Sequence, residues 1–174
     1  MEFHYNYDRL LVIGRSGSGK TRFISQLLRN VPNYLVLTQK VNDFYPKSKI
    51  ILLNADIEQS VNNFILKGIK KAPITLVFED LPSYIYTSNL PELFRKVLIN
   101  GRQIGIGLIF ISQRYKTIPV LVRVQSNIHV YFQSAKDDYM ILPYSYRQYL
   151  DKLKQYEALI VNYDTGDIYI KHKE

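Results

Sequence analysis

The sequence contains the stretch GRSGSGKT at residues 14–21, which fits the pattern G-x-x-x-x-G-K-[ST]. In this pattern the glycines let the backbone curl so that consecutive N–H groups point at phosphate oxygens. A helix that starts directly after the loop adds its positive N-terminal end to the same site. The apolar run LLVI at 10–13 precedes the loop, and an amphipathic stretch at 23–28 follows it. The sequence therefore predicts a strand, a phosphate-binding loop and a helix, in that order.

The loop gives two side chains a chemical role. Lys20 is expected to reach the β- and γ-phosphates of a nucleoside triphosphate, and the Thr21 hydroxyl is expected to hold Mg²⁺. The alternative is a glycine-rich turn with a chance Lys-Thr pair, but both flanks favour the binding loop. ATP and Mg²⁺ are therefore the expected ligands. The predicted ATP contacts are the residues of the loop and the start of the helix: Gly14, Arg15, Ser16, Gly17, Ser18, Gly19, Lys20, Thr21 and Arg22.

Length and composition limit the remaining possibilities. A chain of 174 residues with 47% hydrophobic content suits one domain, residues 1–174, better than two. The net charge of +8 suits a polyanionic partner. The absence of cysteine excludes disulfides and thiolate metal sites. No apolar run approaches the roughly 18 residues that a membrane span needs, and no signal peptide is recognisable. We therefore expect an intracellular protein with no membrane span.

Predicted strands and helices alternate along the chain, as they do in α/β proteins. The strands lack polar alternation, which favours a mostly parallel sheet with helices on both faces. The C-terminal segments 158–161 and 168–170 surround the turn DTGD at 164–167 and predict a β-hairpin. The other expected elements are buried strands at 34–38, 50–53, 74–78, 105–111 and 128–132, a helix at 57–70, and a helix that Asn89 caps with Glu92 three residues on.

A second motif follows the strand ITLVF at 74–78, which ends on Glu79 and Asp80. An apolar strand that delivers carboxylates at its C-terminal end is typical of a Walker B element. Ligands of open parallel sheets bind at this edge, so both acids are expected to face the phosphate loop. We assign Glu79 to the metal by position and Asp80 to the attacking water. The usual order is Asp then Glu, so this division of roles stays open, as does the alternative of two solvated acids.

A third feature is the amide of Gln113, which follows the predicted strand at 105–111. At the carboxyl end of a neighbouring strand, an uncharged amide can hydrogen-bond the γ-phosphate or the attacking water without adding a competing charge. A small-molecule kinase would instead need an arginine-rich lid and a nucleoside pocket, and neither is recognisable. The alternative for Gln113 is an ordinary loop amide.

A further stretch is the run GRQIGIGLIFISQRYKTIP at 101–119, which is followed by Val122-Arg123. Together with the motifs above, it resembles the FtsK–HerA superfamily. The chain is most similar to the genome-packaging ATPases of poxvirus-type and other icosahedral double-stranded DNA viruses. Those proteins combine both Walker motifs with an R-[HQ] stretch, a hydrophobic strand that ends in Gln, and a downstream Pro then Arg. The similarity covers about residues 9–135. The departures are the Glu-Asp order and Gln103 where histidine is common.

The resemblance implies a P-loop NTPase fold of the RecA and FtsK–HerA kind, in a motor that assembles as a ring around duplex DNA. A hexamer or pentamer is expected, with ATP between subunits and an arginine of the neighbour completing the site. The candidates are Arg102 and Arg123, followed by Arg114; each could instead form a surface ion pair or contact DNA. Expected DNA-facing residues, chosen for charge or aromatic character, are Lys40, Lys47, Lys49, Tyr84, Tyr86, Arg114 and Lys116.

The sequence thus predicts an ATP-hydrolysing double-stranded DNA translocase, most similar to a viral packaging motor. Capsid or portal-vertex proteins would then be docking partners, and the location would be the host cytoplasm or the virion. Three alternatives stay open: a cellular or plasmid DNA translocase of the same superfamily, a small-molecule P-loop kinase, and an assembly module that binds ATP without hydrolysing it.

Overall fold

The computed structural model describes residues 3–83, 85 and 90–172, and the strands of these residues form one sheet of eight. The strands are β1 (Arg9–Ile13), β2 (Tyr34–Thr38), β3 (Ile50–Leu52), β4 (Ile74–Phe78), β5 (Ile106–Ser112), β6 (Ile128–Tyr131), β7 (Ala158–Asn162) and β8 (Ile168–Lys171). The α-helices are α1 (Lys20–Leu28), α2 (Ile57–Ile69), α3 (Glu92–Asn100), α4 (Val120–Gln125), α5 (Lys136–Tyr139) and α6 (Tyr144–Leu150). Short 3-10 turns are η1 (Lys47–Lys49), η2 (Leu81–Ser83), η3 (Gly101–Ile104) and η4 (Tyr115–Thr117).

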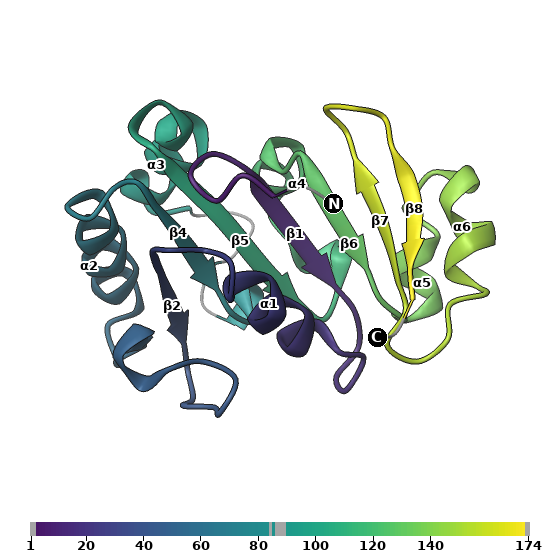
Figure 1. Ribbon diagram of the computed structural model, residues 1–174, viewed down its shortest axis with the longest axis horizontal. Helices are drawn as coiled ribbons and strands as arrows, with labels where there is room; N and C mark the ends of the chain where they lie inside the picture. Colours follow the sequence, from purple (N-terminus) through teal and green to yellow (C-terminus); the bar gives the residue numbers. More distant parts are fainter. Residues whose placement is uncertain (1–2, 84, 86–89, 173–174) are drawn as a thin grey trace.

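The strand order across the sheet is β3-β2-β4-β5-β1-β6-β7-β8. Figure 1 shows this order from β2 to β8. The strands from β3 to β6 in this order are all parallel, and β7 and β8 add an antiparallel hairpin at one edge. This confirms the predicted α/β class, the mostly parallel sheet and the C-terminal hairpin. Strand β5 lies between β4 and β1, so the strand that Gln113 follows separates the acidic strand from the strand that leads into the phosphate loop.

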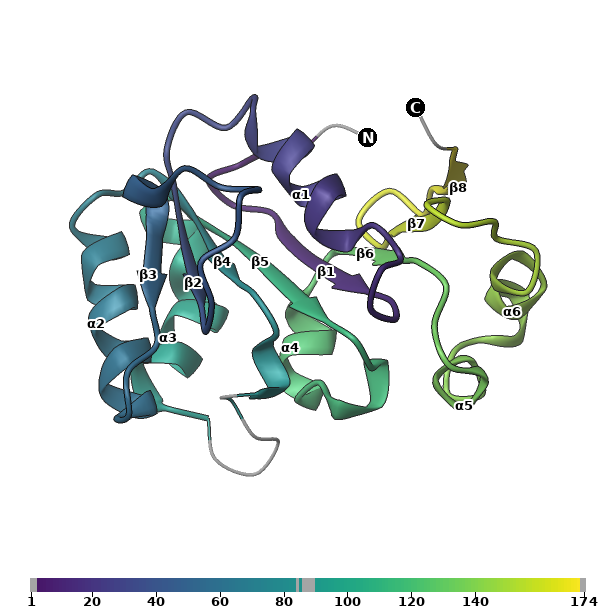
Figure 2. The same cartoon turned by 90° about the horizontal axis from the view of Figure 1, so that it is seen from below.

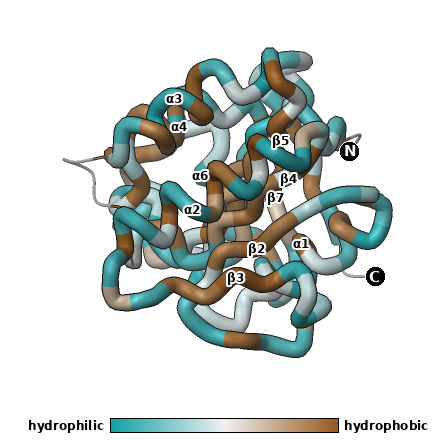
Figure 3. The backbone as a smooth tube through the Cα atoms, turned by 90° about the vertical axis from the view of Figure 1, so that its left-hand side faces the viewer, coloured by the Kyte–Doolittle hydropathy of each residue, from teal (hydrophilic) through white to brown (hydrophobic). Residues whose placement is uncertain are grey.

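Two hydrophobic cores form because alternate residues of each strand point to opposite faces of the sheet. On one face, α1 contributes Phe23, Ile24 and Leu28. On the other face, α2, α3 and α4 pack against the strands, as Figure 2 shows. The apolar segments follow the strands through the middle of the molecule, whereas the outer loops are mostly hydrophilic (Figure 3). The predicted helices on both faces are therefore confirmed.

Two features differ from the sequence prediction. Strand β3 is not buried: it pairs only with β2 at the sheet edge, and Leu52 is 49% exposed. Helices α4, α5 and α6 were not predicted because stretches of four to seven residues hold too few turns for a hydrophobic period. The prediction that Asn89 caps α3 was wrong, because the helix begins at Glu92 with Pro91 in the cap position. Asn89, Tyr84 and Tyr86 themselves lie outside the described residues. Within the described ranges, no helix combines the length and apolarity that crossing a membrane requires.

The core holds the end of β4 through a cluster of aromatic rings. The Phe78 ring packs edge-on against Phe64 and Phe94, with centroids 5.2 Å apart in both pairs, and it stacks on Phe110 at 5.5 Å. Phe78 has no exposed surface, and the next residue in the chain is Glu79. The buried ring therefore anchors the backbone that presents the acid.

We expect Phe78→Ala to lower the free energy of unfolding by about 3–5 kcal/mol, because it removes a ring from a filled core and leaves a cavity. Chemical denaturation measures this change. The matched control is Phe44→Ala, which removes the same ring at a position that is 53% exposed and should cost far less. Equal losses from the two variants would disprove the anchoring role.

Candidate functional site

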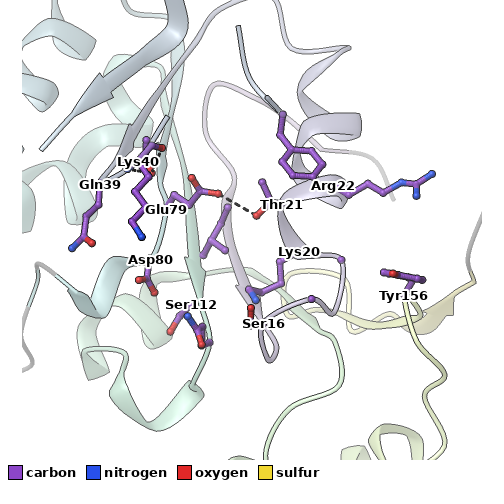
Figure 4. Close-up of a pocket in the computed structure, with 16 residues that line it drawn as sticks. Ser16, Lys20, Thr21, Arg22, Gln39, Lys40, Glu79, Asp80, Ser112 and Tyr156 are labelled. Atoms are coloured by element: carbon purple, nitrogen blue, oxygen red, sulfur yellow. Dashed lines mark hydrogen bonds between the residues drawn. The ribbon is translucent and has the colours of Figure 1, made fainter. Parts of the chain in front are cut away.

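The carboxyl ends of the central strands surround a cavity of about 640 Å³ (Figure 4). This position is expected for a ligand of an open parallel sheet, because successive loops leave the strands there. The cavity brings together the phosphate loop, both predicted acids and the predicted amide from three separate parts of the chain. Its lining residues are Ser16, Gly17, Gly19, Lys20, Thr21, Arg22, Thr38, Gln39, Lys40, Phe44, Glu79, Asp80, Ile111, Ser112, Gln113 and Tyr156.

The loop conformation favours glycine at both glycine positions of the motif, Gly14 and Gly19, and also at Gly17. Gly19 has φ of 107° and Gly17 has φ of 74°, in the region that side chains rarely adopt. A Cβ atom on Gly14 would lie 2.6 Å from Cβ of Phe132 and from Oγ of Ser18. Because helix α1 begins directly at Lys20, its unpaired N–H groups point toward the cavity. The loop is thus a backbone cradle for anions.

Lys20 lies folded against this loop. Its Nζ atom donates to the carbonyl oxygen of Gly14 at 2.6 Å and to that of Arg15 at 3.0 Å. Burial lowers the pKa of the Lys20 ammonium below its ordinary value, although the charges of Asp80 and Glu79 act in the opposite direction. A phosphate in the cradle would supply a stronger acceptor than the two carbonyls.

Glu79 joins the acidic strand to the phosphate loop. The Thr21 hydroxyl donates to Oε1 of Glu79 at 3.1 Å, and the Asn42 side-chain amide donates to Oε2 at 3.0 Å. The backbone N–H of Glu79 also donates to the carbonyl oxygen of Leu37. Both carboxylate oxygens are therefore oriented. Asn42 was missed in the sequence because a polar loop residue after β2 carries no pattern that links it to a strand end.

The other two candidate groups also lie at this edge. Asp80 has φ of 55°, a left-handed conformation that aspartate adopts more readily than most residues. Gln113 lies in a turn in which the Arg114 N–H donates to the Ser112 hydroxyl, and its side chain is exposed in the cavity. Glu79, Asp80 and Gln113 therefore surround one space next to Lys20, as the sequence predicts for adjacent strands.

The donors present fit a magnesium ion that shares its ligands with a phosphate chain. Mg²⁺ usually keeps several waters and takes one or two protein oxygens plus substrate phosphates. The Thr21 hydroxyl and the Glu79 carboxylate, hydrogen-bonded to each other, supply such oxygens. Among the described residues, no cluster of three or more His, Cys, Asp or Glu side chains could hold a metal without a substrate.

Not every loop residue contacts the cavity through its side chain. Arg15 points away from it and donates from Nη2 to Oε1 of Gln133 at 2.7 Å. Ser18 is buried beneath the loop and is only 3% exposed. Arg22 and Ser16, in contrast, line the cavity. Any contact of Gly14, Arg15 and Ser18 with a bound phosphate would therefore come from their backbone N–H groups.

Arg102 and Arg123 lie elsewhere, at the amino edge of the sheet. Together with Arg9 they line a second cavity of about 420 Å³, and the Nε atom of each is buried without a hydrogen-bond partner among the described residues. The Arg123 guanidinium lies 5.1 Å from the centroid of the Tyr115 ring. Burial, and secondarily the charge of Arg102, lower the pKa of Arg9 to about 10. One subunit therefore does not bring these arginines to its own phosphate loop.

Arg114, the remaining arginine candidate, is occupied by acids. It forms ion pairs with Asp137 and with Asp138. The Asp138 side chain is 1% exposed, and its Oδ2 atom lies 2.7 Å from Nε of Arg114. Lys116 also pairs with Asp137. These contacts tie the turn after β5 to α5 and favour a structural role for Arg114.

No protein-family model matches the chain, and a search of curated proteins gave no match either. Solved structures do match. The genome packaging NTPase B204 from Sulfolobus turreted icosahedral virus 2, in complex with sulfate, superposes with a TM-score of 0.83 at 16% identity, over 96% of this chain and 97% of that chain. In complex with ATP-gammaS, the same NTPase has a TM-score of 0.79 at 20% identity, over 96% of this chain and 98% of that chain.

The chain has the fold of a viral genome-packaging NTPase. The P-loop NTPase fold expected from the FtsK–HerA resemblance is thereby confirmed. The cytoplasmic domain of the Thermomonospora curvata type VII secretion ATPase EccC matches less well, with a TM-score of 0.66 at 16% identity, over 93% of this chain and 23% of that chain. On this NTPase fold, the cradle and the acids lie at the edge where parallel sheets bind ligands.

We expect Asn42→Ala to weaken the affinity for a divalent ion about 10–100-fold, because it releases one oxygen of the Glu79 carboxylate from its orienting contact. Binding of Mn²⁺ in the presence of a non-hydrolysable ATP analogue, followed by electron paramagnetic resonance, measures this affinity. The control is Asn30→Ala, at an exposed asparagine after α1. Unchanged Mn²⁺ affinity in Asn42→Ala would rule out the orienting role.

The second cavity gives a pH-dependent prediction through His129. Its Nε2 contacts the carbonyl oxygen of Arg123 at 3.2 Å, so Nε2 carries the proton and Nδ1 accepts from the Tyr131 hydroxyl at 2.7 Å. Burial lowers the pKa of His129 from 6.5 to about 4. The unfolded chain therefore binds a proton between these values that the folded chain does not.

Consequently, we expect proton uptake by His129 in the unfolded chain to lower the free energy of unfolding by up to about 3 kcal/mol as the pH falls from 6.5 to 4. Above pH 6.5 this loss is absent. Denaturation of the parent and of His129→Gln at several pH values measures the difference. The variant should lose less stability with acid, because its amide does not titrate. Parallel pH curves would show that His129 is not the responsible group.

Proposed function

We propose that this chain is a magnesium-dependent ATPase that drives movement along double-stranded DNA as part of a viral genome-packaging motor. The observation that carries the proposal is one cavity in which Glu79, Asp80 and Gln113 lie beside Lys20 and Thr21 of the phosphate loop. We further propose that residues 1–174 act as one ATPase domain.

The proposed roles follow from the chemistry of phosphoryl transfer, which depends on positioning and on charge stabilisation. Lys20 binds the β- and γ-phosphates. Thr21 and Glu79 hold Mg²⁺, which neutralises charge on the phosphate oxygens when bound. Asp80 accepts a proton from the attacking water, and Gln113 orients this water or the γ-phosphate. The hydrogen bonds of Thr21 and Asn42 to Glu79 support its assignment to the metal.

Two observations support DNA as the moving partner. The matched structures include one described as the DNA-packaging ATPase B204 of Sulfolobus turreted icosahedral virus, and the chain carries a net charge of +8. A motor must pass every base, so the contacts should go to phosphates and be sensitive to salt. Capsid or portal-vertex proteins would dock the motor, in the host cytoplasm or in the virion.

We propose that the subunits form a ring, hexameric or pentameric, and the positions of the arginines support shared sites. Arg102 and Arg123 lie at the amino edge of the sheet, whereas the phosphate loop lies at the carboxyl edge. If Arg102 or Arg123 neutralises charge developing on the γ-phosphate, it therefore acts on the site of a neighbouring subunit. Both arginines line a cavity of about 420 Å³ at this edge, which supports this role.

The test is ATP turnover measured against protein concentration, with and without duplex DNA. We expect turnover per subunit to rise steeply with concentration, and DNA to stimulate it less as salt increases. Turnover that is independent of concentration would contradict shared sites. Stimulation by a nucleoside or sugar instead of DNA would indicate a small-molecule kinase.

The match to the EccC ATPase domain favours a second candidate, a cellular translocase of the same superfamily with the same catalytic chemistry. The same assay separates the two proposals. A cellular translocase with a protein substrate would show ATP turnover that duplex DNA leaves unchanged at every salt concentration, whereas the packaging proposal requires DNA stimulation.

We expect Lys20→Ala to reduce turnover by about 10²-fold or more, because the γ-phosphate loses its buried cation. Gln113→Ala should lower kcat about tenfold with ATP affinity retained, because its amide acts on the water or the terminal phosphate. Steady-state kinetics and the melting temperature of each variant check both results. A Gln113→Ala variant with the kcat of the parent would remove Gln113 from the mechanism.

Mixing two inactive variants tests the arginines. In an equimolar mixture of Lys20→Ala and Arg123→Ala subunits, about a quarter of the interfaces combine an intact Lys20 with an intact neighbouring Arg123. We therefore expect the mixture to regain activity that neither variant has alone. If the mixture stays inactive while both variants assemble into rings, Arg123 is not the residue supplied in trans. Arg102→Ala is tested in the same way.

A further inference from the structure

Tyr156 forms one wall of the nucleotide cavity, although no motif contains it. It lies between α6 and β7 and lines the cavity together with Gly19 and Arg22. Its ring packs directly on the phosphate loop, since a Cβ atom on Gly19 would lie 3.0 Å from Cδ1 of Tyr156. The ring remains 37% exposed. An aromatic surface is thus available beside the anion cradle.

The backbone of Tyr156 is strained. Its φ of 71° places a bulky residue in the left-handed region, which such residues rarely adopt. Strain of this kind persists where the surrounding structure holds it, and it concentrates at ligand clamps and active sites. In this conformation the ring lies beside Gly19.

The direction of a bound nucleotide follows from the arrangement of the cavity. Glu79 and Asp80 lie on one side of Lys20 and Thr21, and Tyr156 lies on the other side, toward which Arg22 points (Figure 4). The terminal phosphate must be near the acids and Lys20 for hydrolysis. The phosphate chain then crosses the start of α1, and the nucleoside extends toward Tyr156.

The space on each side of the ring decides where a base can lie. Behind the ring, a small cavity lined by Phe23, Gln26 and Phe132 measures about 40 Å³. It holds only a few water molecules, since one water needs about 10–15 Å³. The main cavity of about 640 Å³ is within the range that holds drug-sized ligands. A base therefore contacts the ring from the main cavity.

We propose that Tyr156 is the nucleobase platform of this site, and that the base of the triphosphate stacks on its ring. The inference rests on the proposed function, because it requires a nucleoside triphosphate in the cradle. Stacking uses the π-face that every base has, so the ring contributes affinity without selecting the base. Phe44, 53% exposed in the same cavity, is the competing aromatic surface.

The experiment compares calorimetric binding of magnesium-loaded AMPPCP and of inorganic tripolyphosphate, which has no base. We expect Tyr156→Ala to weaken AMPPCP binding about tenfold and to leave tripolyphosphate binding unchanged. The guanosine analogue should lose the same factor as AMPPCP. Tyr156→Phe keeps the ring and should bind like the parent. Alanine keeps the same left-handed backbone requirement as tyrosine, so the variant tests the ring and not the strain.

Tyr144→Ala is the matched control, because it removes a tyrosine that is 82% exposed on α6. Equal AMPPCP affinity in Tyr156→Ala and the parent would overturn the platform while leaving the ATPase proposal intact. Loss of AMPPCP affinity in Phe44→Ala, with none in Tyr156→Ala, would move the platform to Phe44 and also overturn the proposal. A parent protein that binds neither ligand would overturn the ATPase proposal itself.

Discussion

The hydrogen bond from the Thr21 hydroxyl to Oε1 of Glu79 is the interaction on which the candidate site depends. It joins the first residues of α1 to the end of β4, across the intervening strand β5. The strand order β4-β5-β1 makes the contact possible, because it places the two chain segments at the same edge of the sheet. The Phe78 ring cluster fixes β4 from within, and the Asn42 amide fixes the second oxygen of Glu79.

The same sheet separates two sets of charged groups. Its carboxyl edge carries the acids and the cradle, and its amino edge carries Arg9, Arg102 and Arg123 around a cavity of their own. The Nε atom of each arginine is buried without a hydrogen-bond partner among the described residues, which is costly unless an anion is available to the group. A neighbouring subunit that presents its bound triphosphate would supply this anion. In the proposed ring, hydrolysis would then depend on contact between subunits.

Much of the fold and the local chemistry could be predicted from the sequence. The phosphate loop is a local motif whose flanking strand and helix have clear periodicity, and the long apolar strands identified a parallel sheet. Glu79, Asp80 and Gln113 were found because each follows an apolar strand directly. The prediction failed for β3, whose apolar residues lie at a sheet edge, and for the short helices α4 to α6.

The remaining features depend on contacts between distant parts of the chain. Asn42 reaches Glu79 only because β2 and β4 are neighbours in a fixed register. Tyr156 reaches Gly19 because the antiparallel strand β7 begins at the edge where β6 ends. No local pattern marks either residue. The position of Arg102 and Arg123 relative to the phosphate loop likewise becomes visible only once the strands are placed in order.

The central claim is that the cradle at residues 14–21 and the acid of β4 bind one magnesium–triphosphate complex together. Calorimetric titration of AMPPCP tests it most directly when it is performed with and without Mg²⁺, on the parent and on Thr21→Val and Glu79→Gln. We expect Mg²⁺ to tighten binding to the parent, and each substitution to abolish most of this gain while leaving the metal-free affinity largely unchanged. No binding to the folded parent, or an undiminished magnesium effect in both variants, would contradict it.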